Sequence, residues 1–298
     1  MNSEVLKKYK EAGKIWKKAE KLGRKLVKPG TKVLDITEKI EALIREEGGE
    51  MAFPLNIGID DVAAHFTPDS DCKIEIKEDS LITLDIGVHV DGYIADAAFT
   101  LSMSESEEHM NLIEAAEKSL ENAIEVVKPG VNVEKIGEAV EETMEEYNVK
   151  PISNLTGHNV DQYSLHSGLT IPNVKKKGGT IKAGTAIAIE PFSTNGAGQV
   201  HDAQEIHIYE FLKKKNIRMQ ESRKILQMAE RDFNKLPFAK RWLEKNVSSL
   251  KLKMALKELL DAEALYQYPV LKEKEKGLVA QAEHTMIVQE DGALLTTA

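Results

Sequence analysis

Two acidic residues, Asp85 and Asp96, are placed by the sequence on one face of a β-hairpin. Residues 81–100 form two apolar segments joined by Asp91-Gly92, the dipeptide most typical of a two-residue hairpin turn. Two carboxylates that share one face can hold a divalent cation between them, whereas unpaired carboxylates are costly to bury. The alternative is an exposed acidic strand face, but the two segments are apolar on both faces, which is typical of buried strands.

The register of this hairpin follows from its turn. A two-residue turn pairs Val90 with Tyr93, so that Gly87 lies opposite Asp96 and Asp85 lies two residues further along the same face. Diagonal neighbours of this kind are about 7–8 Å apart. Gly87 is expected to leave the space beside Asp96 empty. The sequence therefore predicts an acid-lined metal pocket at the hairpin.

The composition of the chain limits the classes of function and partner that it can have. The chain has 298 residues, a formal net charge of −9 and 42% hydrophobic residues, which suffice for a substantial core. The negative charge argues against nucleic acid as the main partner. Cys72 is the only cysteine, which excludes an internal disulfide and favours a reducing compartment. No apolar run approaches the length of a membrane span. The expected location is the cytoplasm, with no membrane partner.

An internal repeat organises the chain. Val27-Lys-Pro-Gly30 recurs 100 residues later as Val127-Lys-Pro-Gly130, and the match continues into the following helix. At an offset of 105, Leu81-Ile-Thr-Leu-Asp85 is similar to Ala186-Ile-Ala-Ile-Glu190, which makes Asp85 and Glu190 the expected ends of equivalent strands. In the first copy, Asp35-Ile-Thr-Glu38 is a plausible helix cap. Two α/β halves with a site between them explain this pattern better than a solenoid of short repeats.

Apolar periodicity supports this organisation. Helical spacing is found at Ser3–Leu26, Ile36–Glu47, Ser106–Val127 and Val133–Tyr147, whereas 81–100, 185–193 and 279–289 are typical of strands. The predicted fold is α+β with largely antiparallel pairing, in one catalytic domain over 1–298 with halves at about 1–105 and 106–298. Residues 211–269 are charged and helical, as expected of an inserted helical subdomain. Its run Lys213-Lys-Lys215 favours a solvated face over a nucleic-acid or ribosome contact.

Four further stretches carry candidate ligands. They are Gly157-His158, Leu165-His166-Ser-Gly168, Ala188-Ile-Glu-Pro-Phe192 and Ala280-Gln-Ala-Glu-His-Thr-Met286. A single histidine or glutamate in such a place is more often a structural hydrogen-bonding group than a ligand. The set is harder to explain in that way, because Glu190 is the repeat counterpart of Asp85, and Glu283 interrupts an otherwise apolar strand. So many acids in a core require cations.

At these motifs the chain resembles the methionine aminopeptidases, in the archaeal-type branch of type 2, and through them the creatinase or pita-bread fold. The resemblance covers nearly the whole chain, and residues 211–269 resemble the helical insert of type 2. The family's five metal ligands correspond to Asp85 in LDIG, Asp96 in GYIADAA, His158 in LTGHN, Glu190 in AIEPF and Glu283 in AQAEHT. Two substrate-facing histidines correspond to His65 in AAHFTP and His166 in SLHSG.

The resemblance also implies roles for these residues. Asp96 and Glu283 would bridge two divalent ions, with Asp85 on one ion and His158 and Glu190 on the other. Glu190 would move a proton from the attacking water to the leaving amine. His166 would contact the scissile peptide, and His65 would lie near the substrate N-terminus. One imidazole among five ligands favours Mn²⁺, Fe²⁺ or Co²⁺ over a tight structural Zn²⁺, although the ligand set does not identify the metal.

For the methionine side chain, the family pattern points to Phe53, Leu165, Phe192 and Tyr268, and less firmly to His207. Without the resemblance, core packing would explain these aromatic residues equally well. The implied activity is removal of the N-terminal methionine from nascent proteins and peptides with a small second residue. The expected enzyme is a monomer that contacts the ribosome transiently and binds no specific nucleic acid.

Two other functions remain open from the sequence. A prolidase or an aminopeptidase P-like enzyme would use the same five ligands, but the helical insert and the AAHFTP segment favour the methionine enzyme. A catalytically inactive relative that serves as a binding module would be expected to lose ligands, and all five are present here.

Overall fold

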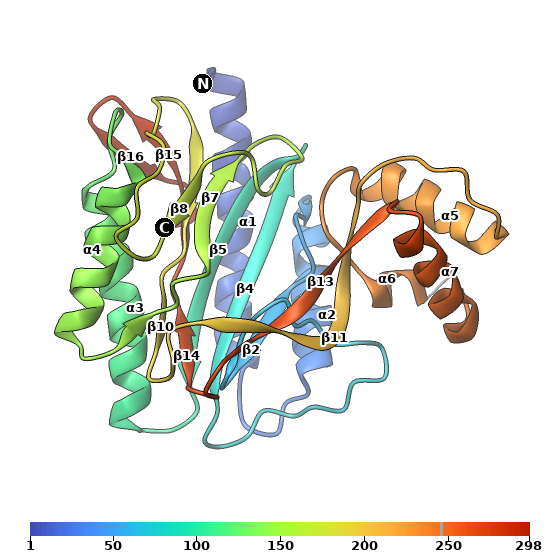
Figure 1. Cartoon of the computed structure of the whole chain (residues 1–298), viewed down its shortest axis with the longest axis horizontal. Coiled ribbons are helices and arrows are strands. Elements are labelled where there is room, and N and C mark those ends of the chain that lie inside the picture. The colour runs from blue at the N-terminus through green and yellow to red at the C-terminus, as the bar shows by residue number, and fades with distance from the viewer. Residues whose placement is uncertain (245–246) are drawn as a thin grey trace.

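The computed structural model describes residues 1–244 and 247–298, which form helices and antiparallel sheets with a group of helices set to one side (Figure 1). The helices are α1 (Ser3–Leu26), α2 (Val33–Glu46), α3 (Glu107–Glu125), α4 (Val133–Glu146), α5 (Gln220–Met228), the π-helical turn η1 (Ala229–Phe233), α6 (Lys240–Glu244) and α7 (Ser249–Asp261). The strands are β1 (Glu50–Met51), β2 (Asn56–Ile59), β3 (Val62–Ala64), β4 (Leu81–Val90), β5 (Tyr93–Ser102), β6 (Lys150–Pro151), β7 (Thr156–Val160), β8 (Thr170–Pro172), β9 (Ala186–Ile189), β10 (Phe192–Thr194), β11 (Val200–Phe211), β12 (Phe238–Ala239), β13 (Leu265–Glu273), β14 (Val279–Gln281), β15 (His284–Gln289) and β16 (Gly292–Leu295).

The β4–β5 hairpin has the register expected from its turn. Val90 pairs with Tyr93, and Gly87 pairs with Asp96. Asp91 and Gly92 both have positive φ angles, 50° and 85°, which a type I′ turn requires. Asp85 lies in the middle of β4, so the expectation that it ends a strand was wrong.

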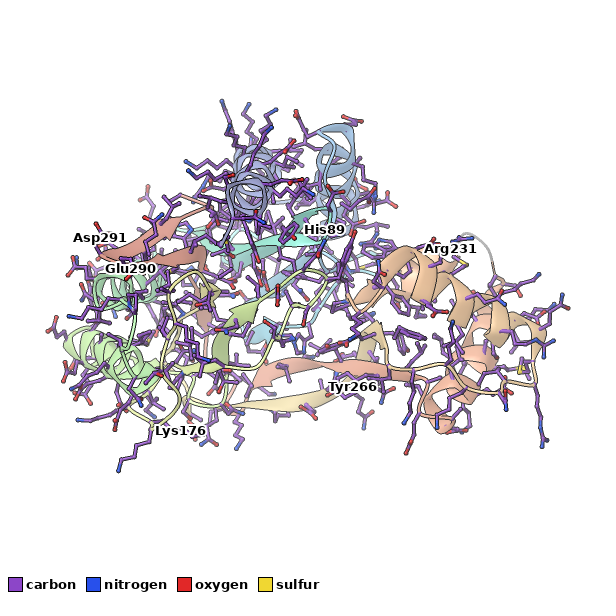
Figure 2. All side chains as sticks on the ribbon, turned by 90° about the horizontal axis from the view of Figure 1, so that it is seen from above. His89, Lys176, Arg231, Tyr266, Glu290 and Asp291 are labelled. Atoms are coloured by element: carbon purple, nitrogen blue, oxygen red, sulfur yellow. The ribbon has the colours of Figure 1, made fainter. Side chains whose placement is uncertain are left out.

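Alternation along the hairpin separates a core face from a site face. Ile82, Leu84, Ile86 and Val88 are buried in one hydrophobic cluster with residues of α1 and α2. Figure 2 shows these two helices together on one side of the sheet. Because successive side chains of a strand point to opposite faces, Asp85 faces away from the helices. The second half repeats this arrangement: Ile187 and Ile189 of β9 pack in a cluster with α3 and α4.

The internal repeat is visible in equivalent backbone hydrogen bonds. Gly30 and Gly130 have left-handed φ angles of 80° and 84°, which glycine adopts without strain. The amide of Gly30 donates to Ile76 O at 2.8 Å, and that of Gly130 donates to Ile181 O at 2.8 Å. The two Lys-Pro-Gly loops therefore make the same turn at the same place in each half, which explains why loop and helix recur together.

Two expectations about element ends were wrong. Residues 185–193 and 279–289 each form two short strands, with breaks at Glu190-Pro191 and at Ala282-Glu283. Pro191 has no N–H for a strand ladder, and its carbonyl accepts from Ala282 N at 3.2 Å, so the two breaks lie side by side.

The expected cap at the start of α2 was also wrong. Asp35 does not cap α2, because the helix begins at Val33 after Lys32, whose side chain makes no capping hydrogen bond.

The group of helices α5–α7, with η1, has its own hydrophobic core and lies to one side of the remaining structure, as Figures 1 and 2 show. This group falls within residues 211–269, and we call that segment the insert. A buried ion pair joins it to α2: Arg241 donates to Glu41 through Nη1 at 2.9 Å and through Nη2 at 2.6 Å. The Trp242 indole donates to the same carboxylate at 3.0 Å.

Replacing Glu41 by leucine is expected to lower the free energy of unfolding by about 3–5 kcal/mol, because it leaves a buried guanidinium without its counter-ion. The urea midpoint of the variant measures this cost. Lys257→Met is a suitable control, since it removes the exposed Lys257–Asp261 pair of the same insert, and such pairs contribute at most about 1 kcal/mol. Equal midpoints for the two variants would contradict the stabilising role of the Glu41–Arg241 pair.

Among the described residues, the apolar length that a membrane-crossing helix requires is not reached by any helix.

Candidate metal centre and substrate cleft

A cleft of about 430 Å³ lies between the two halves and brings the five candidate ligands together. Asp85 and Asp96 come from the middle of the β4–β5 hairpin. His158 lies on β7, Glu190 follows β9, and Glu283 lies between β14 and β15. Two of the five therefore occupy the strand breaks, where the backbone leaves the sheet ladder.

Hydrogen bonds across the sheets hold Asp96 and Glu283 in place. The hydroxyl of Thr285 accepts from Asp96 N at 2.8 Å and donates to Asp96 O at 2.7 Å. Glu283 N donates to Ala98 O at 3.1 Å, and Gln281 Nε2 donates to the Glu283 carboxylate at 3.2 Å. The two acids are thus fixed from opposite strands before any ion binds.

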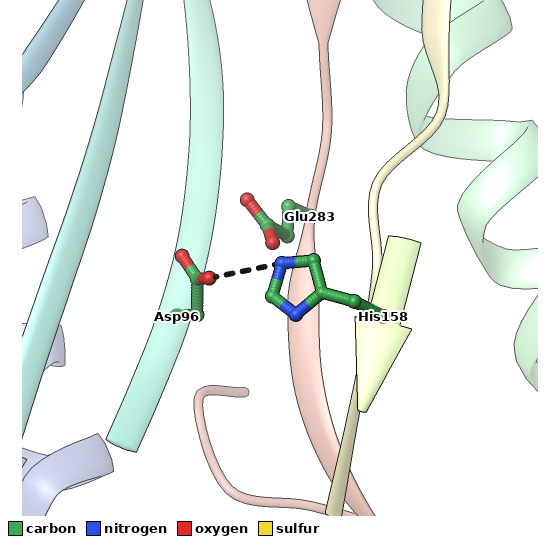
Figure 3. Close-up of side chains that lie close together, drawn as sticks. All are labelled: Asp96, His158 and Glu283. Carbon is green, nitrogen blue, oxygen red and sulfur yellow. Dashed lines mark ion pairs between the residues drawn. The ribbon is translucent and has the colours of Figure 1, made fainter. Parts of the chain in front are cut away.

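Three of the five side chains converge closely. Asp96, His158 and Glu283 each offer a ligand atom within 4.8 Å of the others, and Figure 3 shows the three side chains pointing toward one another. His158 Nε2 lies 3.6 Å from Asp96 Oδ2 and 3.5 Å from Glu190 Oε1.

The electrostatics of this cluster favour binding of a cation. Burial raises the pKa of Asp85 to about 7, and burial together with the charge of Asp85 raises the pKa of Asp96 well above its usual value. The pKa values of Glu190 and Glu283 are raised by burial and by the charges of the neighbouring acids. Buried oxygens of Asp85 and Asp96 have no hydrogen-bond partner. Because an ionised, unpartnered carboxylate is costly to bury, these residues fit a site for hard divalent cations.

His158 has the protonation state that a metal ligand needs. Burial, assisted by the nearby His166, lowers its pKa to about 3, so the imidazole is neutral at pH 7. Its Nδ1 lies 3.3 Å from the carbonyl of Asn159, an acceptor, so Nδ1 carries the proton. The Nε2 lone pair therefore faces the acids, as in neutral histidine ligands.

The metal-free protein should lose stability as the pH rises. The folded pKa of Asp85 is about 7, whereas an unfolded aspartate titrates near about 3.9. The folded state therefore binds the proton more tightly, and the free energy of unfolding falls as the pH rises from about 4 to about 7. Unfolding titrations with EDTA across this range test the slope. Divalent metal should flatten it, because the ion replaces the protons, and equal slopes with and without metal would contradict this account.

Two more histidines, His65 and His166, line the same cleft. His166 lies against His158, with ring centroids 4.4 Å apart. Burial lowers its pKa. Burial also lowers the pKa of His65 to about 4. His65 Nδ1 lies 3.1 Å from Pro269 O and donates to it, so the Nε2 lone pair is free for another contact.

The four residues expected around the methionine side chain, Phe53, Leu165, Phe192 and Tyr268, all line the cleft. The Phe53 ring also corrects the expectation for Gly87: a Cβ built on Gly87 would lie 2.3 Å from a ring atom of Phe53. The space beside Asp96 is therefore filled by an aromatic ring rather than empty. A glycine is needed there because the ring approaches the strand so closely.

His207 is not among the residues that line the cleft in the described part of the chain. It is on β11, and its Nδ1 lies 3.1 Å from Asp69 Oδ1. Two further lining residues, Tyr266 and Asn56, were not predicted from the sequence. Tyr266 could have been found, because it is two residues before Tyr268 on a strand and thus shares its face. Asn56 could not, because it lies opposite Asp85 only through the pairing of β2 with β4. Asp202 also lines the cleft, and no sequence signal pointed to it.

Comparison with known proteins identifies the class. Residues 7–290 match the model of metallopeptidase family M24, and the chain belongs to this family. The methionine aminopeptidase of Methanocaldococcus jannaschii is 44% identical over 298 residues, with all of both chains covered.

Solved structures show the same fold at low identity. A thermophilic Arx1 superposes with a TM-score of 0.88 at 21% identity, covering 99% of this chain and 91% of the other. The methionine aminopeptidase of Thermotoga maritima superposes with a TM-score of 0.74 at 20% identity, covering 100% and 98%. The predicted pita-bread fold is thereby confirmed. Membership of a metallopeptidase family implies the use of divalent metal, consistent with the buried Asp, His and Glu cluster.

Proposed function

We propose that this chain removes the N-terminal methionine from nascent proteins and peptides whose second residue is small. The observation that carries this proposal is one cleft in which two buried and two partly buried carboxylates and a neutral imidazole adjoin an apolar wall. Relatives named methionine aminopeptidase match the chain end to end. An apolar slot suits the unbranched, polarisable thioether of methionine.

We propose that Asp85, Asp96, His158, Glu190 and Glu283 hold two divalent ions, with Co²⁺, Mn²⁺, Fe²⁺ and Zn²⁺ as the candidates. The ions would supply Lewis acidity at the scissile carbonyl and make water more acidic. Buried, unpartnered oxygens on Asp85 and Asp96 support this ligand set, because no protein donor satisfies them.

Three side chains would serve the reaction directly. Glu190 is held beside His158 with a raised pKa, so its carboxylate is suited to take a proton from water and pass it to the leaving amine. His166 would donate to the developing oxyanion of the substrate. His65, at the Tyr268 side of the cleft, would contact the substrate near its N-terminus.

Hydrolysis of Met-Ala-Ser and of X-Pro peptides, measured after reconstitution with Mn²⁺ or Co²⁺, tests the proposal. We expect turnover of Met-Ala-Ser and little turnover of X-Pro. The reverse preference would indicate a prolidase-like enzyme. A metal-loaded protein that cleaves neither peptide would indicate an inactive binding module.

We further propose a transient contact with the ribosome through the insert. Residues 211–269 contain 14 Lys and Arg against 7 Asp and Glu, a net charge of +7, which leaves −16 for the remainder of a chain whose total is −9. Ion pairs to Glu230 and Glu263 satisfy Lys213–Lys215 in part, and all three lysines remain exposed. A positive surface of this kind favours a phosphate backbone without reading its sequence.

Charge reversal tests whether ribosome binding depends on the lysines of the insert or on the positive charge of any lysine run. Lys213–Lys215 mutated to glutamate should reduce co-sedimentation with ribosomes, whereas the same change at Lys175–Lys177 should not. The second run is a matched control, since Figure 2 shows Lys176 on the side opposite Arg231 of the insert. Equal loss in both variants would refute a contact through the insert. Cytoplasmic location and a monomeric state stay predictions, and sedimentation of the pure protein tests the second.

A further inference from the structure

The loop that follows His65 is fastened to the insert by its side chains. Asp69 lies 2.8 Å from Lys240 Nζ and 3.1 Å from His207 Nδ1. Ser70 donates to Glu244 of the same short helix, α6. None of these residues lines the cleft, among the residues that the structure describes.

Arg241, the next residue of α6, holds the same loop from inside the protein. Its Nε donates to Pro68 O at 3.0 Å, and its Nη2 lies 3.4 Å from Thr67 Oγ1. The Arg241 side chain is 5% exposed, and its position is fixed by the two hydrogen bonds to Glu41. We call the contacts of Lys240 and Arg241 with Thr67–Asp69 the clamp.

The clamp begins two residues after a strained backbone position. His65 has a φ angle of 65°, in the left-handed region, which costs a residue with a side chain about 1–2 kcal/mol. Conformations of this kind persist only where the surroundings impose them. On one side of His65, β3 pairs with β13, and on the other side Phe66 O accepts from Ile57 N at 2.8 Å.

The conformation of His65 also sets where its ring lies. The ring meets Tyr268 edge to face, with centroids 5.2 Å apart, and Nδ1 donates to Pro269 O. A relaxed backbone at His65 would rotate the Cα–Cβ bond away from both contacts. The position of the ring in the cleft therefore depends on the loop that follows it.

We propose that Lys240 and Arg241 are positioning residues for His65: by clamping Thr67–Asp69 they hold His65 left-handed, with its Nε2 toward the substrate. This inference rests on the proposed function, because it gives His65 a substrate to meet. Through α6 alone, the insert would then help to set the position of a cleft residue, although its helices lie to one side of the cleft.

Lys240→Met tests the clamp, because it removes the Asp69 partner and keeps the length of the side chain. Lys257→Met is the matched control, since the Lys257–Asp261 pair in the same insert has the same 2.8 Å separation and contacts no part of the loop. We expect kcat/KM for Met-Ala-Ser to fall about tenfold in Lys240→Met, the size typical of losing a group that orients an active-site residue, and to be unchanged in the control. Lys240→Arg should restore most of the loss.

A second measurement follows His65 itself and needs no activity. Diethylpyrocarbonate modifies neutral histidines, and peptide mapping gives the rate at His65 relative to the exposed His201. We expect this ratio to rise severalfold in Lys240→Met and in Asp69→Asn, which breaks the same pair from the loop side. Asp69→Asn also serves if Lys240→Met does not fold.

The outcomes separate the two proposals. A wild-type protein inactive on Met-Ala-Ser refutes the proposed function, whereas the modification ratio still reports on the clamp. The positioning role is refuted if the ratio is the same in Lys240→Met and Lys257→Met, or if kcat/KM falls with an unchanged ratio. A raised ratio with unchanged kcat/KM also refutes it, because the loop would then be held without serving the reaction.

Discussion

Asparagine at position 96 is expected to reduce kcat at least about 100-fold, since even groups that only orient a metal ligand contribute 10–100-fold. Asp96 combines an unpartnered buried oxygen with close approach to His158 and Glu283, so it is the residue around which the proposed ions would gather. Asparagine keeps the shape and the backbone contacts with Thr285, and it removes the charge.

Metal content and thermal unfolding of the Asp96→Asn protein together distinguish the loss of a metal ligand from the loss of the folded state. We expect folded Asp96→Asn protein to bind fewer than two ions per chain, with a thermal midpoint in EDTA at or above that of the wild type, because one like charge has left the cluster. Asp202→Asn is a matched control, since this acid also lines the cleft but is not a proposed ligand. Two tightly bound ions and near-normal turnover in Asp96→Asn would refute its assignment as a ligand.

The residue after methionine should change kcat/KM by at least about 100-fold between alanine and lysine, a ratio that a restrictive pocket can reach through differential binding of the transition state. The cleft is about 430 Å³ in volume, and Phe53, Leu165, Phe192, His65 and His166 line it. If the methionine side chain binds against Phe53, Leu165 and Phe192, as we propose, the next residue would lie near His65 and His166. We expect a small side chain to be accepted there and a long one to be excluded.

A peptide series that varies only the second residue measures this selectivity. Gly, Ala, Ser, Thr, Val, Cys and Pro should permit cleavage, whereas Lys and Phe should not. The comparison of kcat/KM, rather than of KM alone, matters because a peptide can bind without reaching the reactive geometry. Equal kcat/KM for alanine and lysine would overturn the proposed substrate class.

The β4–β5 hairpin shows what a short stretch of sequence can decide. A two-residue turn has few conformations, and an alternating pattern admits one register, so the pairing of Gly87 with Asp96 followed from local residues alone. The repeated Lys-Pro-Gly loops were equally local, and the two glycines have nearly the same φ angle. The resemblance of the motifs to a known family then pointed to candidate ligands that lie far apart in the sequence. In the structure, His158, Glu190 and Glu283 line one cleft with the two hairpin acids.

The strand breaks at Glu190 and Glu283 could not be predicted from the apolar periodicity of the sequence. Both segments have the apolar pattern of a single strand, and each is interrupted where Pro191 at one break meets Ala282 at the other. The space beside Asp96 is likewise filled by the ring of Phe53, which comes from the loop between β1 and β2 and packs against Gly87.

The sequence by itself determined the turn, the strand register, the repeat and the identity of the acidic and imidazole groups, because these depend on neighbouring residues or on motifs a few residues long. Tertiary structure alone decided that His207 turns to Asp69, that Asn56 and Asp202 reach the cleft, and that Arg241 joins Glu41 across 200 residues of chain. The physical reason is that such contacts arise from the packing of whole elements against one another, and no local pattern encodes which distant side chain will share a buried charge.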